Sequence, residues 1–210
     1  MHKVTKYLSN ALIVFCICCL GFFSGCAGTS AGKADLTEGS QAVSASPEGK
    51  PYFTKVNIWY EYKNEKLNPI PSTNYHQGEM LPVGTKVTIK ECSDKKILFA
   101  DDSTNTVYTL VYIAKHGQMT PEEFFGHYFS EGNVMAEGGE FSKFTPEEQS
   151  NIKSGTLAEG MSKEAVLMAY GYPPKIKTPD ISNDVWTFWK NRFDTTVVTF
   201  QDNKIANIKD

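Results

Sequence analysis

Residues 152–174 read IKSGTLAEGMSKEAVLMAYGYPP, residues 185–190 read VWTFWK, and residues 195–208 read TTVVTFQDNKIANI. In the first segment Ser162 is a suitable helix N-cap, and Gly171 followed by Pro173 ends the helix that Ser162 begins. The other two segments alternate apolar and polar side chains as strands do, and Asp202-Asn203 suits a tight turn between strands. With a further helix expected at 146–156, the last third of the chain predicts two helices followed by three antiparallel strands. This order is typical of a two-layer α+β domain.

The region before it, residues 51–117, predicts a small all-β domain. Val56, Ile58, Tyr60 and Tyr62 recur at every second position, which predicts one strand with a buried face. Further short apolar runs separated by Pro and Gly raise the expected number of strands to about four to six, enough for a small barrel or roll. The start of the run at residues 78–87 is loosely similar to the entry of bacterial SH3-like domains.

Two four-residue segments have the same sequence, Thr-Pro-Glu-Glu, at residues 120–123 and 145–148. Each supplies an N-cap threonine, a proline at the first helical position and a glutamate that closes a capping box. They predict helices at 121–130 and 146–156, with a Gly-rich loop at 131–144 between them. The glutamate pairs also resemble catalytic carboxylates, but helix capping is the interpretation that their spacing favours.

The beginning of the chain predicts export. Lys3 and Lys6 precede an apolar run of 13 residues, 11–23, which ends at Ser24-Gly25-Cys26. This order is typical of a secretory signal, and the run is shorter than the roughly 20 residues that a membrane-crossing helix needs. Cysteine after Ser-Gly resembles the lipobox of bacterial lipoproteins, which implies cleavage before Cys26 and acylation of this residue. The alternative is an ordinary secreted protein in which Cys26 has no such role.

The domain organisation that we expect follows from these segments. Residues 1–25 form the lipoprotein signal peptide, 26–50 a flexible tether, 51–117 the small β domain, 118–144 a helical connector and loop, and 145–210 the α+β domain. The tether contains few large apolar side chains, so burial cannot offset the entropy of ordering it. A non-acidic residue after the acylated cysteine, here Ala27, goes with outer-membrane placement in the lipoproteins that the chain resembles.

The charge of the chain argues against nucleic acid as a partner. The 210 residues include 21 basic and 24 acidic side chains, and Arg192 is the only arginine. Loss of the signal would remove Lys3 and Lys6 and make the net charge still more negative. Phosphate binding needs a clustered basic face, which this composition does not provide.

The cysteines indicate a mature chain without an internal disulfide. Cys16, Cys18 and Cys19 fall in the predicted signal, and Cys26 would carry lipid. Cys92 alone remains, and we expect it to be buried on a strand, with intermolecular pairing or a reactive thiol as the alternative. No spacing of His, Cys or acidic residues predicts a metal site, and no motif predicts a cofactor.

Residues 150–210 resemble a known family. The pattern Gly160-Met161-Ser162-Lys163-Glu164 is followed by Gly171-x-Pro173, by Trp186-x-Phe188 and by a terminal Val-x-Phe-x-Asp-x-Lys-Ile. These motifs, in this order, are similar to the SmpA/OmlA domain, the fold of the small lipoprotein of the outer-membrane β-barrel assembly machine. The resemblance implies an α-α-β-β-β domain and protein partners in the cell envelope.

Aromatic side chains are the candidate binding residues, because no catalytic constellation is evident. The candidates are Tyr75, His76, Tyr172, Trp186, Phe188 and Trp189. Strand alternation places Trp186 and Phe188 opposite Trp189, so a single core cannot cover both sides of that strand. Packing inside the protein is the favoured interpretation, and an exposed aromatic face that binds a partner is the alternative.

The function that these observations predict is that of a non-catalytic lipoprotein. It would be anchored by Cys26 in the outer membrane, face the periplasm, and bind protein partners in envelope assembly or maintenance. A second hypothesis is a binding module for cell-wall peptidoglycan or a small ligand, with the Asn74-Tyr75-His76 loop of the β domain as its site. An enzyme is the third hypothesis, and no motif in the sequence favours it.

Overall fold

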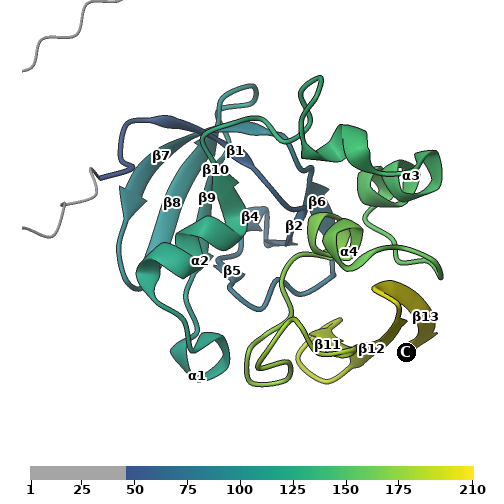
Figure 1. Ribbon diagram of the computed structural model, residues 1–210. Helices are drawn as coiled ribbons and strands as arrows, with labels where there is room; N and C mark the ends of the chain where they lie inside the picture. The colour runs from purple at the N-terminus through teal and green to yellow at the C-terminus, as the bar shows by residue number, and fades with distance from the viewer. Residues whose placement is uncertain (1–45) are drawn as a thin grey trace, which may run out of the picture. The chain divides into compact units, whose positions relative to one another are not determined.

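The computed structural model describes residues 46–210, which form an α+β fold and thereby confirm the predicted fold class (Figure 1). The predicted signal peptide, Cys26 and most of the predicted tether lie outside the described residues. The first strand, β1, begins at Pro51. The prediction of a flexible tether is wrong for its last residues, because Gly49 donates to Ile89 O and Lys50 O accepts from the N–H of Ile89.

The larger sheet has six strands and is curled like half of a barrel (Figure 1). Its strands, in spatial order, are β10 (Phe129–Ser130), β1 (Pro51–Thr54), β7 (Lys86–Cys92), β8 (Lys96–Asp101), β9 (Val107–Val111) and β5 (Ile70–Pro71). All neighbours are antiparallel except β5 and β9, which are parallel. Two small ladders accompany this sheet: β2 (Ile58–Tyr60) pairs with β6 (Glu79–Leu81), and β3 (Tyr62–Lys63) pairs with β4 (Lys66–Leu67).

The prediction of a single strand over 56–62 is wrong. The chain leaves β1 after Thr54 and enters β2 only at Ile58, because the Asn57 side chain turns into the interior and bonds to distant backbone groups. Val56 and Ile58 are buried as expected, but Tyr62 is 50% exposed.

The helices begin where the two Thr-Pro-Glu-Glu segments predict. Helices α2 (Pro121–Tyr128) and α3 (Pro146–Ser154) each have a threonine N-cap and a complete capping box. Helix α2 is shorter than expected, since Phe129 and Ser130 pair with β1 instead. Two short elements were not predicted: α1 (Ala114–Gly117), and the 3-10 helix η1 (Glu140–Lys143) inside the expected loop.

The last third of the chain has the predicted order of elements. Helices α3 and α4 (Lys163–Tyr170) precede the antiparallel strands β11 (Val185–Trp189), β12 (Thr195–Gln201) and β13 (Lys204–Lys209). Ser162 caps α4, as predicted, and accepts a hydrogen bond from the N–H of Ala165. The inner face of the sheet buries Trp186, Phe188 and Phe200 among the residues of both helices.

The buried side chains of the described residues form two hydrophobic clusters. One lies inside the six-stranded sheet and includes Phe124 and Tyr128 from α2, which the sequence placed in a connector. The other lies between the three-stranded sheet and helices α3 and α4, and includes Phe141 from η1. Residues 46–210 nevertheless belong to one compact unit, so the contacts between the clusters matter for the candidate site.

Candidate functional site

Three of the six aromatic residues that the sequence singles out, Tyr75, His76 and Trp189, meet where the two clusters face each other. We call this contact the aromatic seam, and it consists of Trp59, Tyr75, His76, His116, Tyr170 and Trp189. Its rings form two groups: the centroids of Trp59, His76 and Tyr170 lie 3.5 to 5.5 Å apart, and that of Trp189 lies 4.6 Å from His116 and 6.3 Å from Tyr75. The seam joins residues from the β2, 72–77 and α1 region to the ends of α4 and β11.

Next to the seam, Asn57 connects the start of β2 to helices α3 and α4. Its side chain is fully buried and donates to the backbone oxygens of Ile152, at 2.7 Å, and Ala169, at 2.9 Å. Its side-chain oxygen accepts from the N–H of Val83 at 2.8 Å, and its own N–H donates to Met168 O. Every polar group of this side chain is therefore used, as burial of an amide requires.

Asn74 continues the same network. It has a left-handed backbone conformation, with φ of 47°, which asparagine tolerates better than most residues. Its amide donates to Asn57 O at 3.1 Å and to Tyr170 O at 3.4 Å, and its oxygen accepts from the N–H of Trp59. This loop is thereby held against the end of α4.

His76 lies between two backbone carbonyls of the C-terminal part. Its Nε2 is 2.8 Å from Tyr170 O, and its Nδ1 is 3.2 Å from Trp189 O. The ring also stacks on the ring of Tyr170, with centroids 3.5 Å apart. A neutral imidazole carries one N–H, so it can donate to only one of the two carbonyls at a time.

Burial lowers the pKa of His76 to about 4, although both carbonyls act in the opposite direction. The rings of Trp59, Tyr170 and Phe188 exclude water from the imidazole and disfavour its charged form. At neutral pH this histidine is therefore uncharged, and its hydrogen bonds link the 72–77 loop to the ends of α4 and β11.

The strand β11 has the two-sided character that the sequence predicts. Trp186 and Phe188 are each 1% exposed and pack in the second cluster. Trp189 points to the other side, where it is half-buried by the rings of Tyr75 and His116 and by the side chain of Lys177. The second side of the strand is thus covered at Trp189 by other residues of the same chain.

Tyr172 lies beyond the seam and stacks on His127 of α2. The two rings are parallel to within 3°, with centroids 3.8 Å apart, and Lys55 Nζ lies 6.0 Å from the Tyr172 ring. Burial, together with the positive charges of Lys175 and Lys55, lowers the pKa of His127 to about 4.

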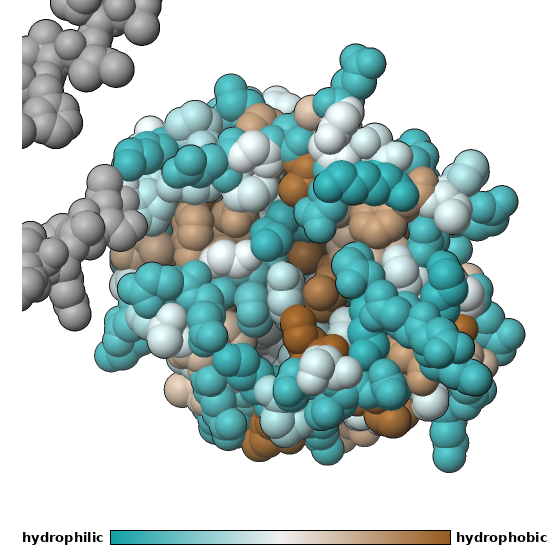
Figure 2. Space-filling view, in the orientation of Figure 1, coloured by the Kyte–Doolittle hydropathy of each residue, from teal (hydrophilic) through white to brown (hydrophobic). Residues whose placement is uncertain are grey.

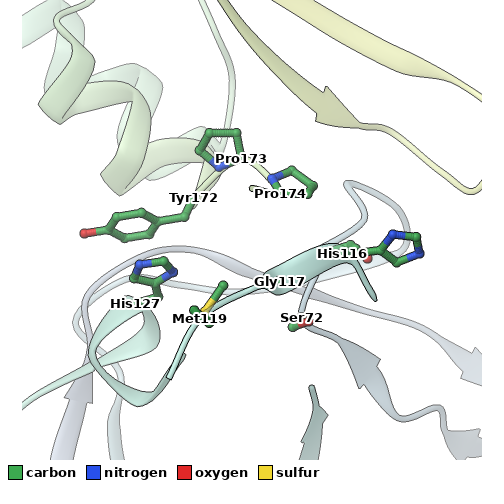
Figure 3. A pocket seen from close by; sticks show the side chains of 9 residues that line it. Ser72, His116, Gly117, Met119, His127, Tyr172, Pro173 and Pro174 are labelled. Carbon is green, nitrogen blue, oxygen red and sulfur yellow. The ribbon is translucent and has the colours of Figure 1, made fainter. Parts of the chain in front are cut away.

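Tyr172 and His127 line a small pocket with Met119, His116 and the Pro173-Pro174 pair (Figure 3). The pocket has a volume of about 10 Å³, which is the room that one water molecule needs. Thr73 Oγ1 and His116 Nδ1, both at this pocket, are buried and have no hydrogen-bond partner within the protein. In Figure 3 the rings of His116 and His127 lie at opposite ends of the pocket, which does not favour joint ligation of an ion. Within residues 46–210, no group of three or more His, Cys, Asp or Glu side chains could hold a metal ion.

The glutamates of the capping boxes act as helix caps in the structure. Glu123 accepts from the N–H of Thr120, and Glu148 accepts from the N–H of Thr145. Glu148 is also buried and accepts from the N–H of Ser162 at 2.8 Å, so one carboxylate bridges the N-termini of α3 and α4. These backbone bonds outweigh burial and lower the pKa of Glu148 below its ordinary value.

Cys92 lies at the end of strand β7 and is half-buried, less than the sequence analysis expected. Burial, with the nearby charges of Glu48 and Glu122, raises the pKa of its thiol. A raised pKa keeps the thiol protonated and weakly reactive at neutral pH.

The sequence analysis did not single out the surface on which large apolar side chains are exposed. Residues 46–210 expose six such side chains, and four of them fall between residues 176 and 193: Ile176, Ile181, Val185 and Phe193. We call residues 176–193 the exposed apolar segment. Figure 2 shows apolar residues at the lower edge of the molecule, the side on which Figure 1 draws β11 and β12. The sequence did contain a signal for this surface, since Phe193 stands between the two predicted strand segments 185–190 and 195–208, outside the alternating pattern of both.

The chain matches no protein-family model, no curated protein and no solved structure. What the fold and the site define is therefore a class: an α+β protein whose two hydrophobic clusters are joined by buried asparagines and an aromatic seam. None of the helices in residues 46–210 is long and apolar enough to span a membrane.

Proposed function

We propose that this protein is a non-catalytic lipoprotein, anchored by Cys26 in the outer membrane and facing the periplasm, that binds protein partners through residues 176–193. The observation that carries the proposal is the concentration of exposed apolar side chains in this segment. The four exposed side chains lie within 18 residues of the chain, and apolar side chains exposed in one region of a folded unit are typical of protein interfaces. The resemblance of residues 150–210 to the SmpA/OmlA domain adds envelope assembly or maintenance as the process.

The spacing along the chain supports an anchored unit. Strand β1 begins 25 residues after Cys26. Glu48, Gly49 and Lys50 are bonded to β7, so at most the 21 residues from 27 to 47 are left as a tether, and they would span about 25 Å if they behave as a flexible chain. Such a tether would let the folded unit reach partners beyond the lipid headgroups.

The arrangement of the seam disfavours the glycan hypothesis. Asn74 and His76, which that hypothesis assigns to a ligand site, hold backbone groups of Asn57, Tyr170 and Trp189 instead. A glycan would have to displace these contacts before it could use the loop. The exposed apolar segment needs no such rearrangement.

The anchor is tested by replacing Cys26 in the full chain. Cys26→Ala should move the protein from the membrane fraction to the soluble fraction, while Cys92→Ala, the matched control, should leave it in the membrane. Membrane association that survives Cys26→Ala would overturn the anchor. Full-length protein retained by isolated peptidoglycan, with no protein partner captured, would favour the glycan hypothesis.

A further inference from the structure

Phe193 is the most exposed large apolar side chain of the described residues, with 83% of its surface accessible. It lies at the tip of the turn between β11 and β12, away from both hydrophobic clusters. The side chain therefore contributes little to the stability of the fold, and its exposure needs another explanation.

The turn that carries Phe193 is well ordered. Asn191 Oδ1 accepts from the N–H groups of Phe193, at 2.8 Å, and Asp194, at 3.0 Å. Asn191 also donates its amide to the Asp194 carboxylate, and Lys190 N donates to Asp194 O. These bonds hold the backbone at Phe193, so little backbone conformational entropy would be lost when a partner binds the turn.

Arg192, a cation without an acidic partner within the described residues, lies beside the ring of Phe193. The guanidinium of Arg192 is 5.2 Å from the centroid of Phe193, and Lys177 Nζ is 5.9 Å from that of Trp189. No carboxylate within residues 46–210 forms an ion pair with either cation, whereas Lys190 pairs with Asp210. Among the charged side chains of residues 190–194, Arg192 alone lacks a side-chain partner within the described residues, because Lys190 pairs with Asp210 and the Asp194 carboxylate accepts from the Asn191 amide.

We propose that Phe193 and Arg192 are the anchor of the protein interface, and that the partner supplies an apolar pocket rimmed by carboxylates. This rests on the proposed function, because it names the contact through which the partner binds. An aromatic ring and an arginine are the side chains that most often dominate binding energy when a pocket encloses them. The Arg192 guanidinium selects a carboxylate at the rim of that pocket, because it is the charged group of the turn that has no partner within the described residues.

The shape of the contact favours a pocket over a flat surface. A ring that is 83% exposed at a turn projects from the surface, and it buries most of its area only when the partner surrounds it. Ile176, which is 47% exposed, lies next to the seam through the bond from its N–H to His116 O. It would add apolar contact at the edge of the same interface.

The test uses a photo-crosslinking amino acid at position 193 of the full chain in intact cells, with matched probes at Val185 and Val107. Val107 is 47% exposed on β9, outside the exposed apolar segment. We expect the probe at 193 to capture one protein, through a peptide that contains or adjoins acidic residues. Arg192→Glu should lower the yield of this product at least fivefold, and Arg192→Lys should largely preserve it.

The alternative outcomes are distinguishable. Capture from Val185 but not from 193 would overturn the role of the tip and leave the proposed function standing. Absence of capture from both positions would contradict the proposed function as well. Products that contain only lipid, a yield that Arg192→Glu does not change, or equal capture from Val107 would each overturn the acidic pocket.

Discussion

The side-chain amide of Asn74 donates to the backbone oxygen of Asn57 at 3.1 Å, and both residues are at most 2% exposed. Through these two residues the β2 region and the 72–77 loop are bonded to the backbone of Ile152, Ala169 and Tyr170. The contact between the two hydrophobic clusters is therefore a buried polar network with aromatic rings beside it. Such a network stabilises one relative placement of its members, since a shift would leave buried groups without partners.

Asn57→Ala should destabilise the protein strongly. The substitution leaves the carbonyl of Ala169 and the N–H of Val83 without their partner, while the carbonyl of Ile152 keeps the bond from the N–H of Gly155. Each unsatisfied buried group costs about 1–3 kcal/mol, so we expect a loss of at least about 2 kcal/mol in the free energy of unfolding. Urea unfolding followed by circular dichroism measures it. The control is Asn207→Ala on the exposed side of β13, and a similar small effect of both substitutions would contradict the network.

Gly171→Ala should also destabilise the fold. Gly171 has φ of 82° and ψ of −173°, a region that is almost restricted to glycine, and a Cβ there would lie 2.8 Å from Asn74 Nδ2. We expect a loss of about 2–4 kcal/mol from the backbone conformation and the displaced asparagine. Gly126→Ala in α2 is the matched control. It has open space around it, and it should raise stability by about 0.5–1 kcal/mol. If both substitutions change the melting temperature in the same direction, the backbone conformation and the close approach of Asn74 do not restrict position 171 to glycine.

The seam makes stability depend on pH. The pKa of His76 is about 4 in the folded protein and near 6.5 when unfolded, so the unfolded state takes up the proton first. The part of the free energy of unfolding that depends on the neutral His76 imidazole is fully present above pH 6.5. It is lost as the pH falls toward 4. It amounts to roughly 2 kcal/mol between pH 7 and 4.5. His127, with a similar pKa, adds to the same window.

His76→Gln removes one titrating group from this window. The variant should be less stable than the native protein at pH 7, and the difference should narrow at pH 4.5. Urea unfolding at the two pH values measures both quantities. If the difference between the proteins is the same at both pH values, His76 is not desolvated as the structure indicates.

The two capping glutamates should respond differently to substitution. The two oxygens of the Glu148 carboxylate accept hydrogen bonds from the N–H groups of Thr145 and Ser162. In Glu148→Gln an amide nitrogen replaces one of these oxygens, so one of the two bonds is lost. We expect a loss of about 2 kcal/mol because the site is buried. Glu123→Gln affects an exposed cap and should have the smaller effect on thermal unfolding. The reverse order would contradict the bridging role of Glu148.

Local chemistry predicted the helices and the C-terminal strands well. Thr145, Pro146 and Glu148 act within one turn of the chain, and the alternation around Trp186 and Phe188 needs only a sheet with one buried face. Such signals can be read from neighbouring residues, which is why the order of elements after residue 145 was predicted correctly.

Long-range contacts explain what the sequence did not predict. Asn57 breaks the expected strand at 56–62 because its partners, Ile152 and Ala169, are about a hundred residues away in the chain. Tyr75, His76 and Trp189 were named separately, but no spacing in the sequence indicates that they meet. The exposed apolar segment was not predicted either, since exposure depends on what the rest of the fold covers.

The claim that the partner binds at the exposed apolar segment, while the aromatic seam serves the fold, is tested most directly by comparing two photo-crosslinking positions in intact cells. Val185 is 52% exposed on β11, and Tyr75 is half-buried in the seam beside Trp189. The account predicts that full-length protein with the probe at 185 captures a discrete envelope protein, and that the probe at 75 captures none. Capture at 75 without capture at 185 would contradict it and would make the 72–77 loop the binding site.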